Sequence, residues 1–294
     1  MSRRGLFVGI TTLDLIYLAP HLPEANEKLS AINSTISAGG PATNASVAFS
    51  YLGNRSRLLS VLGKHPITYL IHSDLDQYQI EHQDLQPQWE ETPPTSSIIV
   101  TQSSADRAVI SLNAVRCQAD PAQIPENILS EIDIVLIDGH QMTVSSAIAQ
   151  QANAKNIPIV VDGGSWKAGF ETVLPYADYA ICSANFYPPN CQTPTDVLNY
   201  LKAIGVPNSA ITQGEKPIIY QTLESQGEIK VPQVSAKDTL GAGDIFHGAF
   251  CHYILQEKLE SAIASASKIA AQACQSFGTR NWMQQDCSSP KVGG

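Results

Sequence analysis

Short β-branched runs alternate with longer helical patterns through much of this 294-residue chain, and this alternation limits its fold more than any other feature. The apolar run at 134–137 is followed by a helical pattern over 144–155, and a second apolar run lies at 159–161. Strands that alternate with helices in this way predict βαβ units, whose strands are parallel. We therefore expect an α/β protein in which helices cover a mostly parallel sheet.

The same rhythm continues on both sides of this region. Further apolar runs predict strands at 6–10, 179–182 and 210–212. Helical patterns predict helices at 170–174, 196–204, 242–256 and 261–277. A hydrophobic share of 43% over this length is enough for a large core. We expect one domain over residues 1–294 with a small appendage.

Two stretches break the rhythm and predict a separate small β-sheet. Residues 15–18 pair in this prediction with 34–37, and residues 97–101 pair with 107–112 across a polar turn at 103–106. We interpret these strands, within about 14–37 and 95–113, as a lid beside the main sheet. The polar tail at 288–294 is predicted to be disordered.

The charge and the cysteine pattern argue against several functions. There are 18 basic and 27 acidic residues, and the net charge of -9 with no basic run argues against a nucleic-acid or anionic-membrane partner. No apolar run has membrane-spanning length, so we expect a soluble cytoplasmic protein. The six cysteines form no C-x-x-C pair, and the seven histidines lack metal-ligand spacing, so no zinc site or disulfide framework is predicted.

The segment 238–244, Asp-Thr-Leu-Gly-Ala-Gly-Asp, opens the helix predicted at 242–256. The backbone N–H groups of Gly241, Ala242 and Gly243, with the positive end of the helix dipole, suit a bound phosphate. Asp244 stands where a carboxylate can take the proton of an attacking hydroxyl. The alternative is an ordinary loop-to-helix connection with a favourable acidic residue. Phe246 stands where a dinucleotide fingerprint needs glycine.

The segment resembles the C-terminal signature of the PfkB, or ribokinase-like, carbohydrate kinases, Asp-Thr-x-Gly-Ala-Gly-Asp. A second block, Gly-Gly-Pro-Ala-Thr-Asn-Ala-Ser-Val-Ala at 39–48, is similar to the family's Gly-Gly-x-x-x-Asn-x-Ala, with Ser46 in place of the alanine. The resemblance covers the whole chain. It implies a three-layer α/β/α fold with a β-sheet lid, and an ATP- and Mg²⁺-dependent kinase that phosphorylates a hydroxymethyl group of a sugar or sugar-like compound.

The resemblance also assigns residues to the sugar. Asp14 holds the place of the family's sugar-binding aspartate after the first strand. Arg107 lies on the second lid hairpin, where either a solvated arginine or a contact to sugar or phosphate fits the sequence. The full set implied to bind the substrate is Asp14, Thr12, Gly39, Gly40, Asn44 and Arg107.

On the nucleotide side, Thr212 and Gly214 resemble the family's Thr-x-Gly-x-x-Gly loop, and with Asn185 and Gly243 they are implied to contact ATP. Two departures stand out. Pro217 replaces the last glycine of that loop and has no N–H to offer, and Pro188 replaces the glutamate of the family's Asn-x-x-Glu element. No metal ligand is assigned, and the way in which Mg²⁺ is organised is expected to differ.

Several implications of the resemblance remain open alternatives. Many members use a monovalent cation such as K⁺, for which Asp238 and Gly278 fall at suitable places, whereas Trp282 stands where a small polar residue is expected. The lid implies a homodimer. The 162–164 turn, Asp-Gly-Gly, favours a ketohexokinase-like or fructokinase-like branch. A nucleoside kinase, with Tyr17 as a stacking residue, and a non-catalytic regulatory protein are the rival interpretations.

Overall fold

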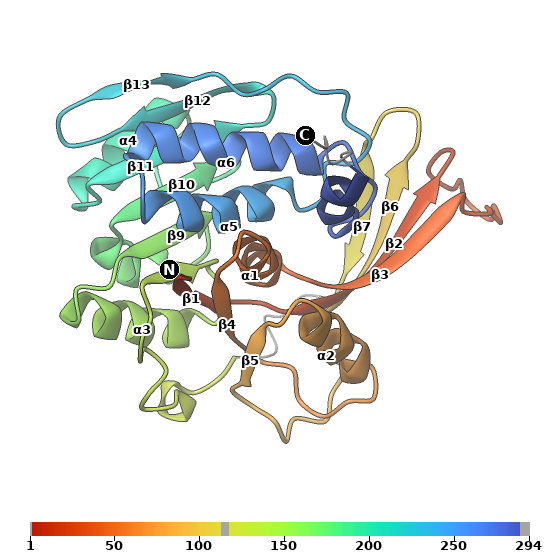
Figure 1. Ribbon diagram of the computed structural model, residues 1–294, viewed down its shortest axis with the longest axis horizontal. Coiled ribbons are helices and arrows are strands. Elements are labelled where there is room, and N and C mark those ends of the chain that lie inside the picture. The colour runs from red at the N-terminus through yellow and green to blue at the C-terminus, as the bar shows by residue number, and fades with distance from the viewer. Residues whose placement is uncertain (1, 113–117, 289–294) are drawn as a thin grey trace, which may run out of the picture.

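The computed structural model describes residues 2–112 and 118–288 and is built around a nine-stranded sheet (Figure 1). The strand order is β13-β12-β11-β10-β9-β8-β1-β4-β5. The strands from β11 through β5 in this order pair in parallel, and β12 and β13 are antiparallel. The bounds are β1 Arg4–Val8, β4 Arg55–Ser60, β5 Glu81–Asp84, β8 Ile134–Ile137, β9 Ile159–Gly163, β10 Tyr179–Ser183, β11 Asn208–Gln213, β12 Lys216–Gln221 and β13 Gln226–Ile229.

Helices cover both faces of this sheet. On one face lie α1 Pro41–Tyr51, α2 Thr68–Gln77, α5 Ala242–Ile254 and α6 Leu259–Ala273. On the other face lie α3 Met142–Ala154 and α4 Pro194–Ala203. The described residues also form the short 3₁₀ helices η2 Pro121–Gln123, η3 Phe170–Thr172, η4 Leu174–Tyr176 and η5 Asn281–Ser288. The predicted three-layer α/β/α architecture is therefore confirmed.

The two cores follow from the two-residue period of a strand. In β8, Ile134 and Leu136 point to the face that α1, α5 and α6 cover, whereas Val135 and Ile137 point to the face that α3 and α4 cover. All four side chains are fully buried. A strand buried on both faces has a continuous apolar sequence, which explains why this run is a reliable strand signal.

A second sheet of four strands, in the order β3-β2-β6-β7, forms the lid (Figure 1). Its strands are β2 Thr12–Ala19, β3 Asn33–Gly39, β6 Thr95–Thr101 and β7 Arg107–Ser111. Asp14 pairs with Ser37 on one side and with Ser96 on the other, so these three side chains share the face that is turned toward the main body. This second sheet agrees with the predicted pairing of its strands.

The structure corrects some of the predicted elements. The helix expected at 170–174 is replaced by the two short turns η3 and η4, because Gly169 has a left-handed φ of 101° and Pro175 cannot continue a helix. The first strand ends at Val8 and not at residue 10. Strands β4, β5, β12 and β13 and helix α2 were not predicted. Residue 113 of the expected lid and the tail at 289–294 lie outside the described residues.

Within the described ranges, none of the helices has the length and apolar character needed to cross a membrane. The cysteines that the structure describes as free thiols are Cys182, Cys191, Cys251 and Cys274.

Candidate active site

The strand order changes direction at β1, and the residues that follow β1 and β8 mark the centre of the candidate site. From β1 the chain builds the sheet outward through β4 in one direction and through β8 in the other. Open α/β sheets bind ligands at the carboxyl ends of their strands where this reversal occurs. The carboxyl ends of β1 and β8 therefore locate the expected crevice.

Asp138, which directly follows β8, joins three segments at this point. It is only 1% exposed. Its Oδ2 accepts hydrogen bonds from the N–H groups of Ile10 (3.0 Å) and Ala42 (3.1 Å), and its Oδ1 accepts one from the N–H of His140 (2.9 Å). Burial acts to raise its pKa, but the nearby His140 and these donors hold the pKa of Asp138 below its usual value. Asp138 thus fixes the Gly-Gly block relative to the sheet.

Asp244 lies in the first turn of α5, where the backbone turns at Gly241 with a left-handed φ of 69°. Its Oδ2 accepts a 2.8 Å hydrogen bond from Nδ2 of Asn44 in α1, although the two residues are 200 positions apart. Burial, with the nearby carboxylate of Asp162, raises the pKa of Asp244 to about 7, against the lowering effect of Asn44. The two sequence motifs therefore meet at Asp244, whose carboxyl group has a pKa near neutral pH.

The turn before Asp244 leaves backbone groups accessible. A Cβ built on Gly243 would have nothing within 4 Å, and Gly243 is exposed, so packing does not require glycine there. A Cβ on Gly241 would lie 2.9 Å from Cγ2 of Thr279, and the N–H of Ala242 already donates to O of Thr239 at 3.3 Å. Glycine at 241 is thus explained by the turn itself, whereas glycine at 243 leaves room for a ligand to approach.

A buried arginine supports this arrangement from behind. Arg280 is 7% exposed and pairs with Asp74 of α2 at 3.1 Å. Its Nη1 donates to Oδ1 of Asn44 (2.9 Å), and its Nη2 donates to O of Ala38 (2.7 Å). Asn44 is consequently oriented, since its oxygen faces Arg280 and its nitrogen faces Asp244.

Asp14 belongs to the lid strand β2, on the face turned toward the main body, and is 6% exposed. Burial raises its pKa, while hydrogen bonds from Thr12 (2.7 Å to Oδ1) and Ser96 act to lower it. A Cβ on Gly39 would lie 1.9 Å from Oδ2 of Asp14, and one on Gly40 would lie 2.4 Å from the carbonyl oxygen of Ile10. These glycines let the lid strand β3 pass close to Asp14 before α1 begins. Thr12 faces Asp14, so its hydroxyl orients the carboxylate.

The lid contacts the turn that precedes α5 directly. Nη1 of Arg107, at the start of β7, donates to Oγ1 of Thr239 at 2.8 Å. The apolar residues Ile16, Ile98 and Val100 on the inner face of the lid form a small cluster against which Leu240 and Phe277 pack. Residues beside the expected catalytic turn therefore hold the base of the lid.

Asp238 and Trp282 have structural contacts. Asp238 is 3% exposed, and its carboxylate accepts hydrogen bonds from the N–H groups of Leu240 (2.9 Å) and Gly278 (2.8 Å). These bonds hold the segment before α5 against the segment after α6. Trp282 is 1% exposed, donates to O of Thr279 and packs against Tyr51. The unusual tryptophan is thus a core residue.

The candidate nucleotide residues lie at or just after the carboxyl ends of β10 and β11. Asn185 is exposed and its N–H donates to Oγ of Ser183 (3.0 Å). Thr212 ends the paired part of β11, and Gly214 turns the chain with a φ of 65°. Pro217 lies in the antiparallel strand β12, where its carbonyl accepts a bond from the side chain of Gln213.

Four residues that matter here were not identified from the sequence, namely Asp138, Asp74, Arg280 and His247. Asp138 had a usable signal, because it directly follows the predicted strand at 134–137. The other three had none, since their partners come from distant elements. His247 is 4% exposed and lies 3.4 Å from Asp162, which is itself 5% exposed. Asp162 lies within β9 and is buried, so the predicted turn begins only at Gly164.

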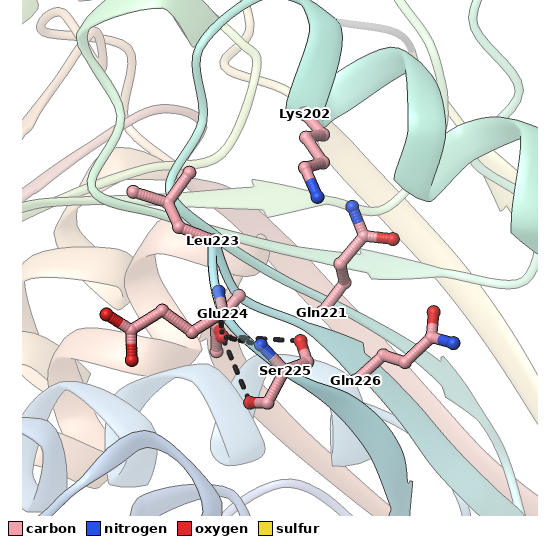
Figure 2. Close-up of a pocket in the computed structure, with 7 residues that line it drawn as sticks. Lys202, Gln221, Leu223, Glu224, Ser225 and Gln226 are labelled. Atoms are coloured by element: carbon pink, nitrogen blue, oxygen red, sulfur yellow. Dashed lines mark hydrogen bonds between the residues drawn. The ribbon is translucent and has the colours of Figure 1, made fainter.

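A pocket of ≈ 260 Å³ lies elsewhere, at the turn between β12 and β13 (Figure 2). Residues 221–226 and Lys202 line it, and Lys202 points toward Gln221. Because β12 runs antiparallel to β11, this turn lies where the parallel strands begin. The pocket is therefore at the opposite edge of the sheet from Asp244 and belongs to another surface.

Known proteins with similar sequences are carbohydrate kinases. The sequence profile described as pfkB family carbohydrate kinase matches residues 3–286. The deoxyribokinase of Salmonella typhimurium is 26% identical over 296 residues, which cover 93% of this chain and 93% of that protein. The ribokinase of Bacillus subtilis is 22% identical over 283 residues, which cover 94% of each.

Solved structures show the same fold. The ribokinase of Thermotoga maritima matches with a TM-score of 0.80 at 19% identity, covering 98% of this chain and 100% of that one. The Arabidopsis thaliana ribokinase complexed with ribose and ATP matches with a TM-score of 0.76 at 17% identity, over 98% and 100% of the two chains. The ribokinase-like fold that the sequence motifs predict is confirmed.

Proposed function

The chain belongs to the pfkB family of carbohydrate kinases, and on that premise we propose that it uses ATP to phosphorylate a hydroxymethyl group of a neutral sugar or sugar-like alcohol. The observation that carries this proposal is the 2.8 Å contact between Asn44 and Asp244. It brings the two motifs together beside the carboxyl ends of the strands. The proposal treats residues 1–294 as a single kinase domain with a β-sheet lid.

In the proposed reaction, Asp244 acts as the general base. Its carboxylate takes the proton of the acceptor hydroxyl as that oxygen attacks the γ-phosphorus of ATP, and ADP leaves. The raised pKa, about 7, suits this role because a base works best when its pKa lies near the working pH. The N–H groups of Gly241, Ala242 and Gly243 stabilise the phosphoryl oxygens, and Ala242 gives up its long bond to Thr239.

ATP would lie along the loops that follow β10 and β11, in contact with Asn185, Thr212, Gly214 and Gly243. The described residues include no group of three or more His, Cys, Asp or Glu side chains arranged to hold a metal ion. Mg²⁺ commonly binds the nucleotide phosphates and keeps several waters, and bound in this way it would neutralise phosphate charge during transfer. No K⁺ site is assigned. Dependence on K⁺ is tested by comparing the activity in KCl with the activity in choline chloride at the same ionic strength.

The acceptor would lie between the lid and α1, where Asp14, Thr12, Asn44, Gly39 and Gly40 meet. A buried carboxylate and an amide can accept from and donate to sugar hydroxyls at defined positions. Arg107 would approach the transferred phosphoryl group from its place on Thr239.

The charges around this space favour a neutral acceptor. Asp14, Asp138 and Asp244 contribute carboxyl groups, whereas the buried Arg280 is already paired with Asp74. An anionic sugar acid would meet like charges there. A pentose, as the names of the deoxyribokinase and ribokinase relatives suggest, and a ketohexose are the acceptors we propose to test first.

The position of Tyr17 does not support the alternative of a nucleoside acceptor. Asp14 and Ile16 face the body of the protein, so Tyr17 points to the outer face of the lid, where it is 40% exposed. It cannot stack on a base bound beside Asp14 in the same chain.

We also propose a homodimer formed through this outer face. Leu15, Tyr17, Ile36, Ile99 and Ile110 share the face through the strand register, and the last of them is 78% exposed. An exposed apolar sheet face without charged side chains suits contact with a second copy of itself. Ile110→Lys should convert the dimer to a monomer in size-exclusion chromatography with light scattering, and an unchanged mass would reject this contact.

ADP release with Mg-ATP over a panel of pentoses, ketohexoses, sugar acids and nucleosides tests the proposed activity. We expect turnover on neutral sugars and none on sugar acids. Asp14→Asn should raise the KM for the sugar more than the KM for ATP, and the exposed Asp76→Asn serves as the matched control. Absence of turnover on every acceptor, with ATP binding retained, would instead support the non-catalytic regulatory alternative.

A further inference from the structure

One buried histidine in α5 has contacts that determine its charge. His247 follows Gly243 by one helical turn and is 4% exposed. Its Nδ1 lies 2.7 Å from the carbonyl oxygen of Gly243, and its Nε2 lies 3.0 Å from the carbonyl oxygen of Ile181 in β10. Oδ2 of Asp162 lies 3.4 Å from Nδ1.

Backbone carbonyls only accept hydrogen bonds, so each ring nitrogen needs its own proton. A neutral imidazole has only one N–H, so its other nitrogen would turn a lone pair toward a carbonyl oxygen at 3.0 Å or less. At a buried position, that carbonyl oxygen would be left without a hydrogen-bond donor, which is unfavourable. This conclusion does not depend on the protonation of Asp162, because the two carbonyls already face both nitrogens. Burial raises the pKa of Asp162, and the nearby His247 acts to lower it. When Asp162 is ionised, its Oδ2, which lies 3.4 Å from Nδ1, balances the charge of the imidazolium.

We propose that His247 is a positioning residue that stays doubly protonated, fastens the phosphate-binding turn at Gly243 to strands β9 and β10, and supplies a positive charge opposite the carboxylates of the site. The fastening follows from its three contacts, which join α5 to Asp162 of β9 and to Ile181 of β10. The proposal rests on the proposed kinase function for its effect on rate, but the protonation of His247 can be measured without any activity.

The surroundings explain why this charge matters for Asp244. Burial, Asp162 and Asp138 all raise the pKa of Asp244, whereas Asn44 and His247 lower it. The ionisable groups packed around the His247–Asp162 pair come from every neighbouring element, and they are Asp138 and His140 after β8, Lys167 after β9, Cys182 on β10, and Asp244 and Cys251 on α5. Burial raises the pKa of both thiols, so they stay neutral. Of the side chains that shift the pKa of Asp244, Asp162 and Asp138 are acidic and Asn44 is neutral, so His247 supplies the positive charge that lowers this pKa.

The direct test is ¹⁵N NMR of the histidine rings in the wild-type protein. We expect both Nδ1 and Nε2 of His247 to carry a proton at pH 7, with His247→Gln used to assign the signals. A signal that shows one unprotonated ring nitrogen at pH 7 would overturn the proposal, whatever the enzyme assay gives.

The second test is the pH dependence of kcat/KM in three variants. His247→Gln keeps an amide donor but removes the charge, so the acid limb should move upward by about one pH unit, a tenfold change in proton affinity. Activity should recover toward wild type at pH 9. Asp162→Asn should move the limb downward, and the double variant should return it toward the wild-type position. A fall of kcat/KM in His247→Gln by the same factor at every pH would indicate a purely structural residue and contradict the proposal.

Discussion

Replacing Asp244 with asparagine should change how the stability of this protein depends on pH. Folding raises the pKa of Asp244 from 3.8 to about 7, mainly by burial. The folded protein therefore holds this proton more tightly than the unfolded chain does. The resulting stabilisation is fully present below pH 3.8 and is lost as the pH rises through about 7. Asparagine has a similar shape and no such titration.

The expected size follows from the pKa values. Each pH unit between the two pKa values corresponds to about 1.4 kcal/mol, so acidification from pH 8 to pH 5 would favour the wild type over Asp244→Asn by about 3 kcal/mol. Asp244 keeps part of its surface exposed, and solvent screening reduces this figure. We expect a relative gain of about 1 to 2 kcal/mol.

Urea unfolding of both proteins at pH 5, 6, 7 and 8, followed by circular dichroism, measures this gain. The other ionisable groups are the same in both proteins, so their contributions largely cancel in the difference. A stability difference that does not change with pH would refute a raised pKa for Asp244. A wild type that loses stability relative to Asp244→Asn on acidification would show that the pKa is lowered.

Three further predictions concern the surroundings of Asp244. Arg280→Met should lower the free energy of unfolding by about 3–5 kcal/mol, because the acceptors on Asp74, Asn44 and Ala38 would all lose the buried guanidinium that donates to them. Urea unfolding checks this, and a loss below about 1 kcal/mol would contradict it. Gly243→Ala should leave the melting temperature unchanged or higher, since a Cβ there meets nothing within 4 Å. The same change should lower kcat/KM at least about tenfold, because the added methyl group would crowd the bound phosphate. Unchanged kinetics would show that Gly243 does not belong to the anion site. The wild-type kcat/KM should fall about tenfold for each pH unit below about 7, and a flat profile down to pH 5 would exclude a base with that pKa.

The sequence was most informative where the chemistry and the fold depend on neighbouring residues. The continuous run at 134–137 predicted β8, because a strand buried on both faces needs apolar residues throughout. The hydrogen bond between Asn44 and Asp244, which are 200 residues apart, was not predicted; the family resemblance assigned Asn44 to the sugar and Asp244 to catalysis, and only the structure shows that the two side chains touch. Periodicity alone contains no information about such a distance.

The sequence was least informative where the partners come from distant elements. Arg280 looks like an ordinary residue near the C-terminus, yet α2, β3 and α1 each supply an acceptor for its guanidinium. His247 resembles any helical histidine until β10 places a carbonyl at its Nε2. The short turns η3 and η4 replaced a predicted helix because Gly169 and Pro175 bracket only a few residues.

In the proposed reaction, Asp244 removes the proton from a sugar hydroxyl during phosphoryl transfer. The most direct measurement is single-turnover phosphorylation of the best neutral sugar from the panel by wild type and Asp244→Asn, at saturating Mg-ATP and pH 8. The rate should fall about 10²–10⁴-fold in the variant, while ATP affinity stays within about threefold. Wild-type turnover by Asp244→Asn would contradict the claim.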